Sequence, residues 1–190
     1  MMIPDWNITG LIPPIMPGVA GHSDERSPYS VTSLDIVNQF TTTKERYLIL
    51  KGFLEYRQDL YNHGVKEGFQ WLNGSFTQDI ERQESRPPND MDVVTFFILP
   101  ENLDDNKMKT LHQLFDTDAM KTKYKVDAYP FVLNHQITAP DIKMISYWYS
   151  MWSHTRDGIW KGFVQVALSE TDDTIALNTL QLIAREDGYE

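Results

Sequence analysis

The chain has 190 residues, a length typical of a single domain, and 41% of them are hydrophobic, so a packed core can form. It contains no cysteine, which excludes disulfides, thiolate metal ligands and cysteine nucleophiles and leads us to expect a reducing, cytoplasmic location. Its formal net charge of −10 argues against long nucleic acid as a partner, and the absence of a signal-peptide pattern and of an apolar run of roughly 18 residues argues against a membrane.

Proline dominates the first 32 residues, which we expect to form an extended arm. Five of the ten prolines lie here, at positions 4, 13, 14, 17 and 28, and that density interrupts regular structure. Apolar residues between the prolines, such as Ile3, Trp6 and Leu11, indicate that the arm packs along the surface of the domain. Residues 33–190 are then expected to form one domain.

Two helices and a short strand are expected next. Hydrophobic spacing predicts a short helix beginning at Ser33 and a longer one that ends near His63, with Gly64 as its C-cap. Residues 68–72 form a short apolar run that stops at a turn sequence, residues 73–75, which predicts a buried strand leading into a tight turn.

The strongest strand pattern of the sequence covers residues 90–99, where β-branched and aromatic residues follow two aspartates and Pro100 ends the run. Helices and strands alternate after it. We expect helices near 104–115 and 118–124, a strand at 125–131, a helix near 141–153, a strand near 162–168 and a helix near 174–185. This alternation predicts an α/β domain.

Three aspartates in strand-like contexts form a candidate metal site. Residues two apart on a strand face the same side, so Asp90 and Asp92 are expected to point together, and Asp127 joins them if its strand lies alongside. Close carboxylates repel each other unless a cation or a shared proton compensates them, and hard oxygen ligands suit Mg²⁺ or Mn²⁺. The alternative is an ordinary solvated strand start, because Asn-Asp is also common in turns.

Two further groups of residues are candidates for binding a nucleotide. Gly74 permits a close approach of the backbone to a phosphate, and Ser75 offers N–H and hydroxyl donors, although Asn-Gly is also an ordinary turn. Arg156 and Lys161 lie near a cluster of tryptophans and tyrosines, so they are candidates to pair with phosphates while an aromatic ring stacks on a base. The alternative is that these aromatic residues belong to the core.

The order of these features resembles the nucleotidyltransferase superfamily of DNA polymerase β. That pattern is an apolar strand, Gly-Ser or Gly-Gly, a spacer, an acid-x-acid strand and a later single acid, and the corresponding segments here are Trp71-Leu72-Asn73-Gly74-Ser75, Asp90-Met91-Asp92-Val93-Val94 and Val126-Asp127-Ala128. Over most of its length the chain also resembles an uncharacterised bacterial family of nucleotidyltransferase-like proteins, through Ile3-Pro4, Gly74-Ser75-Phe76, Arg86-Pro87-Pro88-Asn89-Asp90 and Lys161-Gly162. The spacer is longer than in compact members of the superfamily, and a short extra helix at 76–82 is expected to absorb it.

The resemblance implies a mixed β-sheet flanked by helices and a nucleoside triphosphate as substrate. It implies that Asp90 and Asp92 bind Mg²⁺ or Mn²⁺, that Asp127 completes the site and activates the nucleophile, and that the Gly74-Ser75 turn holds the triphosphate. An enzyme of this kind transfers a nucleoside monophosphate to an acceptor, and small members act in bacterial toxin–antitoxin or phage-defence systems.

Two hypotheses about function follow. The first is a metal-dependent nucleotidyltransferase, such as an ATP-binding one, acting on a protein or small-molecule acceptor, since the acidic charge disfavours long RNA. The second is a non-catalytic nucleotide-binding or protein-interaction module within a larger assembly. The intact set of three acids favours the enzyme.

Overall fold

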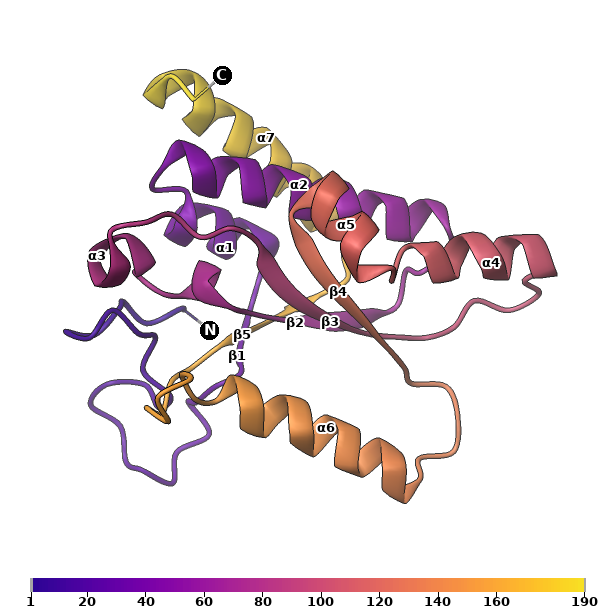
Figure 1. Cartoon of the computed structure of the whole chain (residues 1–190), viewed down its shortest axis with the longest axis horizontal. Coiled ribbons are helices and arrows are strands. Elements are labelled where there is room, and N and C mark those ends of the chain that lie inside the picture. Colours follow the sequence, from indigo (N-terminus) through magenta and orange to yellow (C-terminus); the bar gives the residue numbers. More distant parts are fainter. Residues whose placement is uncertain (1, 190) are drawn as a thin grey trace.

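Five strands form one mixed sheet in residues 2–189, the part of the chain that the computed structural model describes (Figure 1). The strands are β1 (Tyr29–Val31), β2 (Gly68–Asn73), β3 (Met91–Phe97), β4 (Val126–Val132) and β5 (Val164–Ala167). Their order is β1-β5-β2-β3-β4, with β1 parallel to β5, β3 parallel to β4, and β2 antiparallel to both of its neighbours. The predicted α/β class with a mixed sheet is confirmed.

Seven α-helices and one 3-10 turn accompany the strands within these residues, and the last helix follows the last strand. They are α1 (Ser33–Phe40), α2 (Lys44–Asn62), η1 (Ser75–Thr77), α3 (Ile80–Glu84), α4 (Asp105–Gln113), α5 (Thr117–Tyr124), α6 (Ala139–Trp152) and α7 (Glu170–Asp187). The first two helices begin where the side chains of Thr32 and Thr43 accept hydrogen bonds from backbone N–H groups of the first turn, which explains why one apolar stretch divides into two helices. None of the described helices has both the length and the apolarity needed to cross a membrane.

Different helices cover the two faces of the sheet. Side chains alternate between the faces along each strand, and one face packs against α1, α2, α5 and α7 to form the larger core (Figure 1). Helix α6 lies on the opposite face (Figure 1), where its Trp148 and Trp152 belong to a second cluster with Trp71, Phe96 and Phe131. The candidate site lies on this second face.

Two segments differ from the sequence-based expectation. Residues 29–31, expected within the arm, form strand β1, which has no local signature because it is short and pairs only with the distant β5. The helix expected at residues 76–82 is replaced by η1 and α3, with an extended Gln78 between them.

The segment before β1 contains no helix or longer strand among its described residues. Ile3, Leu11 and Ile12 of this segment are nonetheless buried. Residues 1 and 190, at the outer limits of the expected arm and domain, lie outside the described residues.

Candidate functional site

Three polar side chains form a row across neighbouring strands. Asp92 of β3 is in register with Asn73 of β2 on one side and with Asp127 of β4 on the other. Strand alternation places all three on the face that carries α6, at the end of the sheet where β2 finishes and β3 and β4 begin. Asp90 lies just before β3, one residue outside the strand in which it was expected.

The turn at Gly74, which follows β2, lies in close contact with Asp92 of this row. Gly74 has a φ of +87°, a conformation that side chains disfavour. A Cβ atom built on Gly74 would lie 2.5 Å from Oδ2 of Asp92, closer than any real contact permits. Only glycine therefore allows the turn to approach the Asp92 carboxylate, and Ser75 begins η1 immediately afterwards.

A cleft of about 840 Å³ opens over the row. Its walls come from the N-terminal segment, the turn and α3, the segment before β3, Lys121 of α5, the end of α6, and the loop that follows α6. The seven residues singled out from the sequence all line this cleft: Gly74, Ser75, Asp90, Asp92, Asp127, Arg156 and Lys161. A volume of this size suits a small organic ligand.

The carboxylates in the cleft are electrostatically strained. Burial, together with the negative charges of Asp90 and Asp127, raises the pKa of Asp92 to about 6, while the charges of Lys161 and Lys121 oppose the rise. Oδ1 of Asp127 is buried and accepts no hydrogen bond from any described residue. The site therefore holds more negative charge than its own cations neutralise.

Lys121 is a member of the site that the sequence analysis missed. Its Nζ lies 2.6 Å from Oδ2 of Asp90 and 3.8 Å from Oδ2 of Asp127, and its side chain is about half exposed. The packing of α5 against β4 brings this lysine to the acids, and a lysine on a helix with further lysines just after it gives no local signal in the sequence.

Lys161 lies beneath the cleft and is 3% exposed. Its Nζ donates a hydrogen bond of 2.8 Å to Oδ1 of Asn73, whose amide in turn donates to the backbone oxygen of Trp152. Burial lowers the pKa of Lys161 to about 8, against the opposing charge of Asp92. A buried lysine beside these carboxylates is a suitable donor of a charge-assisted hydrogen bond to a phosphate.

Arg156 occupies the exposed tip of a small hairpin, in which His154 pairs with Trp160. Trp152 is the one aromatic residue among the lining residues, and it is almost fully buried. Tyr149 and Trp148 pack against other aromatic rings outside the cleft. Of the predicted aromatic cluster, Trp152 and Trp148 therefore belong to the second core, as the alternative interpretation held, whereas Tyr147, Tyr149 and Trp160 are exposed.

The three carboxylates of the cleft floor are suitable ligands for a divalent cation. Asp90, Asp92 and Asp127 offer hard oxygen ligands, and Oδ1 of Asp127 accepts no hydrogen bond from the described residues. A bound cation would also relieve the repulsion between the three negative charges. No group of three or more such side chains in residues 2–189 is already gathered tightly enough to hold an ion, and Lys121 bridges two of the acids. Cation binding would require Lys121 to withdraw and the acids to close in.

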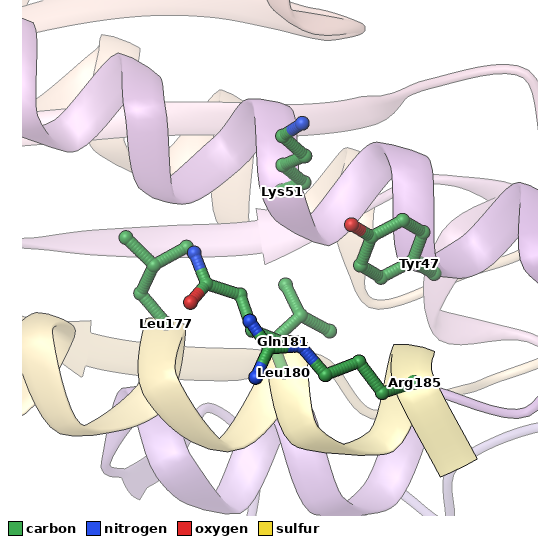
Figure 2. A pocket seen from close by; sticks show the side chains of 6 residues that line it. All are labelled: Tyr47, Lys51, Leu177, Leu180, Gln181 and Arg185. Atoms are coloured by element: carbon green, nitrogen blue, oxygen red, sulfur yellow. The ribbon is translucent and has the colours of Figure 1, made fainter. Parts of the chain in front are cut away.

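A separate small pocket of about 170 Å³ lies between α2 and α7, away from the acids (Figure 2). Its lining residues come from both helices and include Tyr47 and Lys51 of α2 and Leu177, Gln181 and Arg185 of α7 (Figure 2). It has no acidic lining residue and only side chains of the helical layer, so it offers none of the chemistry of the cleft.

Residues 4–167 match the sequence profile of a protein family described as a family of unknown function (DUF6932). The chain belongs to this family. The DUF6932 match includes all five strands and every residue of the candidate site, and it ends before α7. No curated protein and no solved structure gives a significant match.

Proposed function

We propose that the chain is a metal-dependent nucleotidyltransferase that transfers a nucleoside monophosphate from a nucleoside triphosphate to a protein or small-molecule acceptor. The observation that carries the proposal is the row of Asn73, Asp92 and Asp127, with Gly74 pressed against the central acid at the floor of a ligand-sized cleft. Carboxylates from neighbouring strands beside a glycine turn match the requirements of phosphoryl chemistry.

In this proposal Asp90, Asp92 and Asp127 would hold Mg²⁺ or Mn²⁺. Such a cation, when bound, polarises the phosphate oxygens and offsets negative charge as the leaving group departs. The need for it follows from the charges around Asp92, where the carboxylates of Asp90 and Asp127 oppose its ionisation and an incoming triphosphate would add further negative charge.

The remaining roles belong to the chain's own residues. Gly74 and Ser75 lie where backbone N–H groups and a hydroxyl can donate to phosphate oxygens, Lys161 supplies a buried positive charge, and Arg156 supplies an exposed one. The acceptor oxygen forms a bond to the α-phosphorus, the bond from this phosphorus to the bridging oxygen of the leaving group breaks, and pyrophosphate leaves. In this proposal a carboxylate oxygen of Asp127 would take the acceptor's proton.

The proposal includes a cytoplasmic location, because the chain has no cysteine and its substrates are cytoplasmic. A role in toxin–antitoxin or phage-defence systems rests on the family resemblance alone.

Calorimetric titration tests the proposal. Each nucleoside triphosphate, as its α,β-methylene analogue with Mg²⁺, is titrated into the wild type and into a variant carrying Asp90→Asn and Asp92→Asn. The proposal expects one or more analogues to bind the wild type and not the variant. Failure of all analogues to bind the wild type would contradict it.

A second candidate function is that of a non-catalytic interaction module, and the exposed apolar side chains of α6 favour it. Five large hydrophobic side chains of this helix are exposed: Ile142 at 59%, Met144 at 49%, Tyr147 at 54%, Tyr149 at 38% and Met151 at 43%. Exposed apolar residues gathered on one helix are typical of surfaces that bind a partner. A partner that binds equally well when the Asp90 and Asp92 substitutions have abolished nucleotide binding would support this candidate.

A further inference from the structure

Arg46, in the first turn of α2, is fully buried and fixes the backbone that follows the glycine turn. Its guanidinium donates hydrogen bonds of 2.7 Å to the backbone oxygen of Phe76 and 2.5 Å to that of Gln78. The same group makes a two-pronged ion pair with Glu81 of α3, at 2.7 and 2.8 Å. One side chain thus connects the turn, the residues after it and the next helix.

Trp6 of the N-terminal segment completes this support. Its indole Nε1 donates a hydrogen bond of 3.0 Å to the backbone oxygen of Thr77, and its ring lies 5.1 Å from the guanidinium carbon of Arg46. The ring of Phe76 lies 5.4 Å from the same carbon. Three consecutive carbonyls, those of residues 76, 77 and 78, therefore bond to side chains from outside the loop.

Within the loop, the side chains of Thr77 and Gln78 donate hydrogen bonds to the backbone oxygen of Gly74, so the glycine turn depends on where residues 77 and 78 lie. Among its backbone hydrogen bonds, the amide of Gln78 donates to the oxygen of Ser75, and the amide of Asp79 donates outward to Gly10. A three-residue 3-10 turn is too short to maintain its geometry alone. The position of Ser75 and of the Gly74 backbone, both of which line the cleft, depends on the contacts made by Arg46 and Trp6.

The choice of arginine fits this task. A buried charge is costly unless its hydrogen-bonding groups are satisfied, and the planar fork of arginine meets two carbonyls and a carboxylate at once. Lysine keeps the positive charge but cannot reproduce that fork. An Arg46→Lys variant therefore tests the geometry of these contacts while the charge stays the same.

We propose that Arg46, assisted by Trp6, is a positioning residue that holds the 74–78 loop in the conformation required to bind the phosphates of the nucleotide. This inference rests on the proposed function. Arg46 does not itself line the cleft and acts through the loop, in which its partner Gln78 does line it.

The chain provides a matched control on the same helix. Arg57 is also fully buried in α2, and it bonds to Asp173, Gln70 and the backbone oxygen of Ala167 on the helical side of the sheet, away from the cleft. Arg46→Lys and Arg57→Lys are therefore the same change in the same helix, and only one of them touches the loop.

The experiment measures three quantities for each variant: the melting temperature, the affinity for the α,β-methylene triphosphate analogues with Mg²⁺, and amide hydrogen exchange over residues 74–79. Both variants should melt at a lower temperature. Arg46→Lys should weaken analogue binding by about tenfold or more through misplacement of the loop. Arg57→Lys should change binding by less than about twofold, as expected of an independent site.

Hydrogen exchange separates failure of this inference from failure of the proposed function. If no analogue binds the wild type, the proposed function fails, while faster exchange over residues 74–79 in Arg46→Lys alone still supports the positioning role. Equal losses of affinity in the two lysine variants, or unchanged loop exchange in Arg46→Lys, would overturn the inference. If Arg46→Lys does not fold, Trp6→Phe replaces it, since this change removes the indole donor to Thr77 and keeps an aromatic ring, and it should give a smaller loss in the same direction.

Discussion

Replacement of Asp92 by asparagine is expected to stabilise the metal-free protein at neutral pH. Burial and the neighbouring charges of Asp90 and Asp127 raise the pKa of Asp92 from 3.8 to about 6, so the folded state holds this proton more tightly than the unfolded state does. Ionisation of Asp92 then opposes folding. This penalty is absent below the ordinary pKa, grows as the pH rises from about 4 to 6, and is complete at higher pH.

The size of the effect follows from the displaced pKa. A difference of one unit between the folded and unfolded pKa corresponds to about 1.4 kcal/mol, so the penalty on the folded state reaches up to about 3 kcal/mol above pH 6. For a chain of this size, that corresponds to a rise in melting temperature of roughly 6–12 °C. Asparagine preserves the shape of the side chain and removes the charge.

The assay is thermal and urea unfolding of wild type and Asp92→Asn in EDTA, near pH 4 and near pH 7.5. Asp157→Asn, at an exposed position on the rim of the same cleft, is the control and should shift stability by less than about 0.5 kcal/mol. Added Mg²⁺ should raise the melting temperature of the wild type and leave Asp92→Asn unchanged. The reasoning is refuted if the variant is no more stable than wild type near pH 7.5, or if it gains as much near pH 4.

Three further changes have defined expectations. Gly74→Ala should cost about 1–3 kcal/mol in urea unfolding, because of its positive φ and the clash with Asp92, and should also abolish nucleotide binding in calorimetry; normal binding would show that the turn tolerates a side chain. Lys161→Met should weaken binding of the triphosphate analogues by about tenfold or more, since it removes a buried charge-assisted hydrogen-bond donor, while circular dichroism reports an intact fold. Trp152→Ala should cost about 3–5 kcal/mol in urea unfolding because it empties part of the second core. Tyr147→Ala, at an exposed position of the same helix, should cost less than about 0.5 kcal/mol. Similar costs for the two variants would contradict the assigned orientation of α6.

Local patterns in the sequence were sufficient for most of the fold. The strand predicted at 90–99 corresponds to β3, and the apolar run ending at the Asn-Gly turn corresponds to β2, because both have dense β-branched or aromatic residues and clear stops. Strand β1 was missed because three residues carry no period, and its stability comes from β5 alone. The extra helix after Ser75 was misplaced because Arg46 and Trp6 hold that segment in a different shape.

The candidate site was only partly accessible from the sequence. Types and order of residues were enough to select Asp90, Asp92 and Asp127, and the cleft includes all three. The sequence could not supply the register that places Asp92 beside Asp127, nor the packing of α5 that brings Lys121 to the acids. Both depend on contacts between elements, which local propensity does not encode.

The pairing of β1 with β5 has a consequence for the order in which the chain folds during its synthesis. A ribosome completes β1 early, but the strand that must lie beside it is made last, and the side-chain hydrogen bond between Ser30 and Gln165 spans 135 positions. Arg57 of α2 likewise cannot form its buried ion pair until Asp173 of α7 has been synthesised. Such long-range closure slows folding and leaves strand edges exposed in the nascent chain, so this protein should reach its native state only after β5 and α7 have been made and should be sensitive to chaperone supply until then.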